Sequence, residues 1–267
     1  MKPIMTILKE LIVNIHLIIR LAVYEVKGSY QGHYLGVFWQ FLSPALQLFL
    51  YWFVFGVGLR SGKPVGETPF FIWLMVGLIP WFFLSGSILQ GSNSIYSKVN
   101  LVSKMKFPVS VLPSITIVGK AFGFMLMLLI LFFILFVYGI NPGLYLLQLP
   151  YYLLSIFAFL FATTLLFSTI STIVRDFQQI IQSSMRMLLY LSGIFWDINR
   201  LPDVFVGILK LNPLYYIIAG FRDTFLGQQW FFDDWQYTLY FWSTTLLILF
   251  IGSVVHIRFR KQFIDYI

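Results

Sequence analysis

The residues that could do catalytic chemistry in this chain are few and widely spaced. Three histidines, His16, His33 and His256, are scattered along the sequence and form none of the short spacings that bind a metal ion. Asp233-Asp234 is an acidic pair that could hold a divalent ion near a phosphate, but a lone acidic pair is more often solvated surface. The 267 residues include no cysteine, which excludes thiolate chemistry and disulfides. The sequence therefore predicts no catalytic residue and no metal site.

Two glycine–lysine pairs invite comparison with the P-loop that binds the phosphates of ATP. They are Gly62-Lys63 and Gly119-Lys120. Proline follows the first pair and alanine the second, where the motif needs serine or threonine, and neither pair has the required glycine five residues earlier. ATP binding through this motif is excluded, so any ATP-driven work must come from a partner.

Composition assigns the chain to the membrane. Hydrophobic residues make up 59% of the sequence and charged residues 10%, whereas a soluble domain carries about 25% charged residues. The net charge of +8 then indicates basic loops on the cytoplasmic side rather than nucleic-acid binding. Proton- or sodium-coupled carriers usually place carboxylates inside their spans. Such residues are missing here, which argues against secondary transport.

Residues 1–34 predict an amphipathic helix lying in the cytoplasmic membrane interface. At 100° per residue, five basic residues fall within about 40° of one another on a helical wheel. They are Lys2, Lys9, His16, Arg20 and Lys27. A neighbouring apolar arc faces the acyl chains, while the basic stripe faces anionic headgroups. The alternative, a seventh span, would have to bury Glu10, Arg20 and Glu25.

Residues 35–267 predict one transmembrane domain of six helices, so the fold class is an all-α integral membrane protein. Each apolar run is long enough to cross a hydrocarbon core of roughly 30 Å, and prolines or polar turns separate the runs. The predicted spans are 35–59, 70–89, 115–140, 151–174, 180–196 and 237–257. With the termini inside, 13 basic residues are cytoplasmic and 5 are outside. The positive-inside rule therefore favours cytoplasmic termini.

Residues 197–235 are an unusual outer segment between the fifth and sixth predicted spans. The segment contains two apolar pieces, 204–209 and 214–219, that are too short to cross the membrane. Asn212-Pro213 separates them and suits a helix start. Two short re-entrant helices fit this pattern, provided that protein covers their broken ends. An ordinary extracellular helical hairpin packed on the spans is the alternative.

Several motifs in this order resemble the permease subunit of ABC-2 type exporters of lipid-linked polysaccharides. The motifs are Leu35-Gly36-x-x-Trp39-x-x-Leu42-x-Pro44, Gly77-Leu78-Ile79-Pro80-Trp81, Asn100-Leu101-Val102-Ser103-Lys104 with Phe107-Pro108, Val174-Arg175-Asp176-Phe177, Asn212-Pro213-Leu214-Tyr215-Tyr216, and Gly220-Phe221-Arg222-Asp223. None is diagnostic alone, but their order covers nearly the whole chain. Within the family, the sequence is most similar to wall teichoic acid translocation permeases.

The resemblance implies a bacterial plasma-membrane protein that works as a homodimer with two separate ATP-binding cassette subunits. ATP and Mg²⁺ would bind to those partners, and this chain would hold no cofactor. The cargo would be a polyprenyl-pyrophosphate-linked teichoic acid or related cell-surface polysaccharide, moved outward. Two alternatives remain open: an ABC-2 permease for a small lipid or drug, and a membrane-bound polyprenyl-linked glycosyltransferase. The lack of clustered carboxylates disfavours the glycosyltransferase.

In exporters of this kind, the ATPase pushes on short cytoplasmic helices of the permease, and the basic segment 92–108 is the best candidate here. The expected coupling residues are Tyr96, Lys98, Asn100, Leu101 and Lys104, with Arg175 and Asp176 as a second contact. The alternative is that the lysines of this segment act only as topology determinants.

Cargo contacts divide into headgroup and path residues. The anionic headgroup is expected at Lys27, His33 and Arg186. Arg186 alternatively pairs with Asp176 or extends to the interface. Aromatic faces that stack on sugars are expected along the path at Phe38, Trp39, Phe41, Trp81, Phe82 and Phe83. Helix packing and lipid contact are the competing explanation for each of these aromatic residues.

Overall fold

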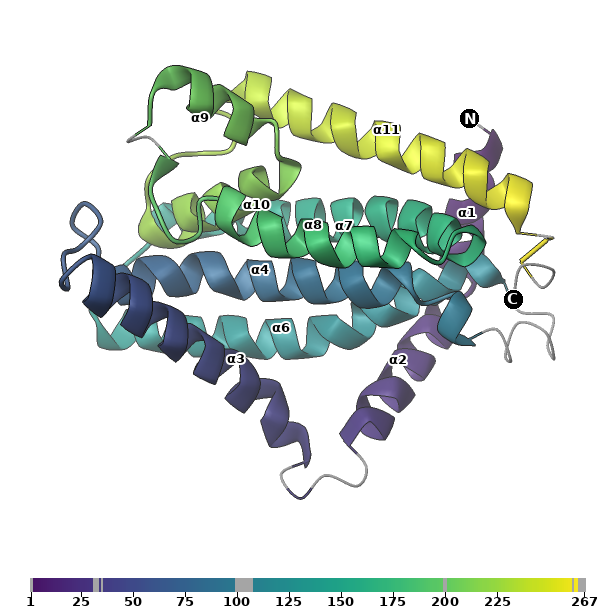
Figure 1. Ribbon diagram of the computed structural model, residues 1–267, viewed down its shortest axis with the longest axis horizontal. Helices are drawn as coiled ribbons and strands as arrows, with labels where there is room; N and C mark the ends of the chain where they lie inside the picture. The colour runs from purple at the N-terminus through teal and green to yellow at the C-terminus, as the bar shows by residue number, and fades with distance from the viewer. Residues whose placement is uncertain are drawn as a thin grey trace.

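The computed structural model describes residues 2–30, 34, 36–98, 108–198, 201–260 and 262–263. Within them the chain is a bundle of helices, and the single β-bridge joins Val65 to Thr68. Figure 1 shows helix α1 and the last turn of α11 at one end of the bundle, here called the termini end. Helix α9 and the loop that precedes α4 lie at the opposite end, here called the far end.

The helices follow one another through short turns. Their bounds are α1 Lys2–Val13, α2 Ile15–Tyr30, η1 Gly36–Phe38, α3 Trp39–Tyr51, η2 Trp52–Leu59, α4 Phe70–Ser92, η3 Tyr96–Lys98, η4 Val109–Val111, α6 Leu112–Val137, η5 Gly143–Gln148, α7 Leu149–Ile173, α8 Phe177–Leu191, α9 Asp203–Lys210, α10 Pro213–Leu226 and α11 Trp235–Phe259.

Five helices in the described part of the chain are long and apolar enough to cross a membrane, and a sixth is counted if the bent α9–α10 pair is one span. The five are Phe41–Leu59, Phe70–Ser92, Val109–Val137, Gly143–Ile173 and Trp235–Phe259. The prediction of an all-α integral membrane protein is confirmed. Long apolar runs become helices because only a helix satisfies every backbone group within one segment of a lipid-embedded chain.

The predicted fifth span is shorter than its apolar run. Helix α8 has 15 residues, about 22 Å at 1.5 Å per residue, which is less than the roughly 30 Å of a hydrocarbon core. It ends before Gly193, whose φ of +62° leaves the helical region. Residues 192–196 continue as a turn followed by bends. This segment therefore does not cross as a single continuous helix.

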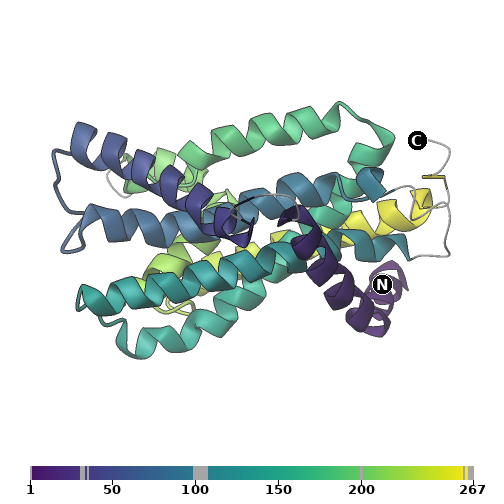
Figure 2. The same cartoon turned by 90° about the horizontal axis from the view of Figure 1, so that it is seen from below.

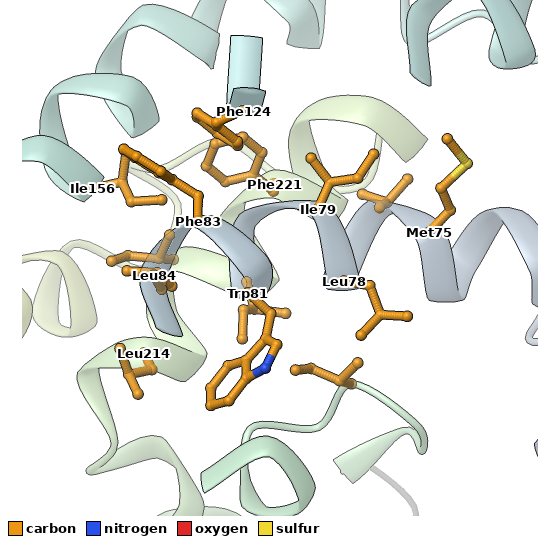
Figure 3. Packing of buried hydrophobic residues seen from close by; sticks show 14 of the residues in the cluster. Met75, Leu78, Ile79, Trp81, Phe83, Leu84, Phe124, Ile156, Leu214 and Phe221 are labelled. Atoms are coloured by element: carbon orange, nitrogen blue, oxygen red, sulfur yellow. The ribbon is translucent and has the colours of Figure 1, made fainter. Parts of the chain in front are cut away.

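Helix α4 forms the centre of the bundle. Its sequence is apolar on all sides, which is typical of a helix surrounded by protein. Of its most apolar stretch, 78% is buried inside the bundle. It packs against α6, α7, α8 and α10. Figure 3 shows Phe83 stacked near Phe124 on one side of α4 and Trp81 pointing to the opposite side. The rings of Phe83 and Phe124 lie 4.4 Å apart and nearly parallel.

The first span, Phe41–Leu59, runs through α3 and η2 and contrasts with α4, because only 11% of its most apolar stretch is buried inside the bundle. Large apolar side chains such as Leu46, Phe49, Leu50 and Phe53 are exposed along it. Figure 1 shows α2 and α3 inclined to each other like the two arms of a V. The α3 surface is therefore available to lipid or to another protein chain.

The N-terminal segment forms two helices with a bend at Asn14, where a single helix was predicted. The Asn14 side-chain Nδ2 donates to the Glu10 carbonyl oxygen at 2.7 Å, and this oxygen also accepts the Asn14 backbone amide at 3.2 Å. Figure 2 shows the two helices running in different directions. The basic residues Lys9, His16, Arg20 and Lys27 remain exposed. The amphipathic character is present, while its position relative to a membrane remains a prediction.

The outer segment forms two helices that differ in burial. Helix α10 begins where Asn212 Oδ1 accepts a hydrogen bond from the Leu214 amide at 3.0 Å, and it packs in the bundle against α4 and α7. Gly220 allows that packing, because a Cβ there would overlap the Tyr152 ring. Helix α9 has no buried residue and meets α10 at a bend of 99°. The geometry fits a re-entrant or broken span in which only α10 enters the core.

Candidate coupling patch and lateral cavity

Two predicted coupling stretches, far apart in sequence, meet at the termini end. Tyr96 lies in η3, and Arg175 lies in the turn between α7 and α8. The Arg175 Cζ is 5.0 Å from the Tyr96 ring centroid, which is a cation–π contact. We call the surface formed by Tyr96, Lys98, Arg175 and Asp176 the coupling patch. Asp176 is exposed beside Arg175, at the start of α8.

A glutamine that sequence reasoning missed holds the coupling patch to the central helix. Gln178 Oε1 accepts a hydrogen bond from Ser92 Oγ at 2.7 Å, and its Nε2 donates to the Leu89 carbonyl oxygen at 2.9 Å. The start of α8 is thereby fixed to the end of α4. A displacement of the patch would therefore be transmitted directly to the helix at the centre of the bundle.

The patch also connects to the N-terminal helices through an ion pair. Lys98 Nζ pairs with Glu25 Oε1 of α2. Farther along the N-terminal segment, Glu10 pairs with Arg260 at 2.8 Å and accepts a hydrogen bond from Ser110. These contacts attach α1 and α2 to three different parts of the bundle at the termini end. Three other predicted coupling residues, Asn100, Leu101 and Lys104, lie outside the described residues.

A cavity of about 330 Å³ opens in the flank of the bundle among α2, α3, α4 and α6. It is here called the lateral cavity. Three predicted path residues, Trp39, Phe82 and Phe83, line it. Trp81 lies in the core instead, at 4% exposure. Phe38 is exposed and Phe41 half-buried, and neither lines the cavity.

The lateral cavity contains a lysine that was not among the predicted site residues. Lys120 lines it from α6, eight residues after the helix begins. Pro113 in the first turn of α6 marks that start, and counting from it would have put Lys120 about 10 Å into the span. The span was instead predicted to begin at residue 115, which left Lys120 near the boundary.

A second recess, of about 260 Å³, links the lateral cavity to the coupling patch. Its lining includes Lys98 and Gln178, and it shares Glu25, Gln90 and Thr116 with the lateral cavity. Polar side chains therefore run from the termini end into the flank of the bundle.

Two of the three predicted headgroup residues, Lys27 and Arg186, lie apart from the lateral cavity. Lys27 is exposed on α2, and Arg186 is exposed on α8, where its Nη2 donates to Ser183 Oγ at 3.3 Å. Neither lines the cavity. His33 lies outside the described residues. The role of all three in headgroup binding stays a prediction.

Three of the residues considered first for chemistry, His256, Asp233 and Asp234, have structural partners. His256 is buried and its Nδ1 is 2.9 Å from Thr169 Oγ1. Asp233 accepts a hydrogen bond from the Trp230 amide, and Asp234 caps α11 through the Tyr237 amide. Among the described residues, no three His, Cys, Asp or Glu side chains gather closely enough to hold a metal ion.

Arg222, a buried residue of the last sequence motif, joins α10 to two other parts of the bundle. Arg222 donates to the carbonyl oxygens of Gly193 and Ile194 at 2.7 and 3.0 Å. Its Cζ lies 3.4 Å from the centroid of the Trp73 ring. Trp73 and Arg222 also border a polar pocket of about 250 Å³ between α10 and α11. Arg222 therefore fixes α10 to α4 and to the bends after α8.

The described helices define the chain as a multi-pass membrane protein. Residues 16–226 match the ABC-2 type transporter family, and the chain belongs to that family. Proteins of this family work with a separate ATP-binding subunit.

Three relatives illustrate the range of similarity. An O-antigen export system permease protein RfbA from Myxococcus xanthus is 26% identical over 251 residues, which are 93% of this chain and 94% of the relative. Another RfbA, from Klebsiella pneumoniae, is 24% identical over 242 residues, 90% of this chain and 91% of the relative. The inner membrane transport permease YadH of Escherichia coli (strain K12) is 48% identical over 40 residues, 15% of this chain and 16% of the relative.

Proposed function

We propose that this chain is the membrane-spanning subunit of an ATP-driven exporter of a polyprenyl-pyrophosphate-linked polysaccharide, a teichoic acid or a related cell-surface polymer. The cargo moves from the cytoplasm to the outer face of a bacterial plasma membrane. Two RfbA proteins that align with nine-tenths or more of the chain carry O-antigen export in their names, which supports a polysaccharide as cargo.

The contact between Tyr96 and Arg175 is the observation that carries the mechanism. It joins the segment after α4 to the segment before α8, so one surface at the termini end can receive force from an ATP-binding subunit. Gln178 connects that surface to the backbone of α4 at Leu89. Closure of the ATPase against the coupling patch would thus tilt α4 and α8 together.

A homodimer with two ATP-binding subunits accounts for the size of the cargo. The lateral cavity, at about 330 Å³, is too small for a chain of sugars. Two copies related by a two-fold axis can enclose a wider passage at their interface. The exposed apolar surface of α3 is available for such a contact. The 13-to-5 distribution of basic residues supports cytoplasmic termini and a patch that faces the ATPase.

Depletion of the chain in its host, with analysis of the lipid-linked precursor, tests the function. Export of a polymer predicts loss of that polymer from the cell surface and accumulation of its polyprenyl-linked form inside. Unchanged surface polymer and precursor on full depletion would contradict the proposal. Altered resistance to a small lipophilic compound, without precursor accumulation, would instead support the alternative of a small-lipid or drug permease.

A further inference from the structure

Lys120 is a basic residue inside a helix that is long and apolar enough to cross a membrane. It lies within the Val109–Val137 span, is half-buried, and makes no hydrogen bond or ion pair within the described part of the chain. An ionised side chain within a span is costly, and such residues usually pair with an anion or face a water-filled cavity. Lys120 faces the lateral cavity.

The charges around the lateral cavity leave an excess of one positive charge. Glu25 is the carboxylate in its lining, and its Oε1 pairs with Lys98. Lys98 lines the adjoining recess. With that pair neutralised, Lys120 remains as the uncompensated charge among the described residues that line the cavity. Gln90, Thr116 and Ser43 add hydrogen-bonding groups to the same lining.

The outer wall of the cavity is suited to a lipid tail. Trp39 and Pro44 of α3 form part of the lining, and the span continues through α3 and η2 with exposed Phe49, Leu50 and Phe53. On α6, Leu126, Leu129 and Phe133 are also exposed. A headgroup beside Lys120 could therefore keep its apolar chain against α3 and α6 in the hydrocarbon region.

We propose that the lateral cavity binds the phosphate group of a membrane lipid and that Lys120 is its ionic contact. Two lipids share this chemistry: a polyprenyl pyrophosphate and an anionic phospholipid of the bilayer. Only the first rests on the proposed function, because it would make the cavity a reception site for the cargo's carrier lipid. The second would make it a site for a resident lipid between α2 and the spans.

Binding can be measured on the purified full-length chain in nanodiscs. The sequence has no cysteine, so Ser43→Cys gives a single labelling site in the cavity lining for a bimane fluorophore that Trp39 can quench. One titration adds farnesyl pyrophosphate to phosphatidylcholine nanodiscs, and a second series raises the fraction of phosphatidylglycerol. We expect a saturable fluorescence change in at least one arm.

Substitutions test whether Lys120 makes the contact. Lys120→Met is expected to raise the half-saturation concentration of the lipid at least tenfold, because it removes a charge-assisted hydrogen bond. Lys120→Arg keeps the positive charge, so its half-saturation concentration should stay within about threefold of that of the unsubstituted protein. Gln90→Glu, at an exposed position of the lining, is expected to weaken binding by placing a negative charge near the phosphate. Lys63→Met, in the exposed loop before α4, is the matched control and should have no effect.

The outcomes separate the two lipids and the two proposals. A response to farnesyl pyrophosphate that needs Lys120 supports a carrier-lipid site, and a response only to phosphatidylglycerol supports a resident-lipid site. No response in either arm, or the same response in Lys120→Met as in the unsubstituted protein, overturns the inference. If Lys120→Met does not fold, a half-saturation concentration for Gln90→Glu equal to that of the unsubstituted protein would also overturn the inference. Because the assay does not measure export, its failure leaves the depletion test unaffected.

Discussion

Gly77 and Arg222 are in contact across the centre of the bundle: a Cβ on Gly77 would lie 2.7 Å from Nη2 of Arg222. The two residues come from motifs 145 positions apart, in α4 and α10. The missing side chain at Gly77 leaves space for the guanidinium, which then reaches the carbonyl oxygens of Gly193 and Ile194. Gly77 of α4 and Arg222 of α10 therefore depend on each other, because the guanidinium occupies the space that a side chain at position 77 would fill.

Gly77→Ala is predicted to destabilise the protein by about 1–3 kcal/mol, because the added methyl group displaces Arg222 from its hydrogen bonds. Arg222→Met should cost at least as much, since it leaves two buried carbonyl oxygens unpaired. Thermal melting in detergent measures both. Gly28→Ala is the control, because a Cβ there meets nothing within 4 Å. Equal melting temperatures for Gly77→Ala and Gly28→Ala would contradict the contact.

Tyr96→Ala is predicted to lower export while Tyr96→Phe preserves it, because the ring rather than the hydroxyl faces Arg175. A cation–π contact is worth about 0.5–1 kcal/mol at an exposed site, so a two- to fivefold loss of export is expected. The measurement is surface polymer together with ATPase activity of the assembled complex. If Tyr96→Phe and Tyr96→Ala behave alike, the contact with Arg175 does not contribute to coupling.

Lys98→Glu is predicted to reduce export by bringing two carboxylates together at the junction with α2, and Glu25→Lys in the same chain should restore part of it. A pair of this exposure contributes about 0.2–1 kcal/mol, so rescue of a few-fold is expected. The amount of chain in the membrane is measured in parallel. Should Lys98→Glu lower insertion instead, with no rescue by the swap, Lys98 would be a topology determinant only.

Trp39→Leu is predicted to lower export more than Trp39→Phe, since leucine keeps an apolar side chain in the first span but loses the aromatic face that borders the lateral cavity. Export is measured at matched expression. Leu46→Ala, on an exposed part of the same helix, is the control for a general effect of changing α3. Full export with Trp39→Leu would reject both a path role and an anchoring role for this residue.

Prediction from sequence succeeded for the long apolar helices and for local signals. The Asn212-Pro213 pair begins α10, as its cap and its fixed φ require. Prediction from sequence was less successful at the places where a single residue ends or bends a helix. Gly193 ends α8 before a full crossing, and Asn14 separates α1 from α2. Such interruptions depend on single backbone conformations that hydrophobic periodicity does not report.

The sequence alone determined the class of fold and the family resemblance. An apolar segment in lipid has to satisfy its backbone groups internally, so length and composition are enough to predict a helix. Contacts between segments were decided only by the tertiary structure. It brought Tyr96 to Arg175, separated Trp81 from the other path aromatics, and placed Lys120 in a cavity formed by four helices. These outcomes depend on how side chains far apart in sequence fit together, and no local pattern encodes that fit.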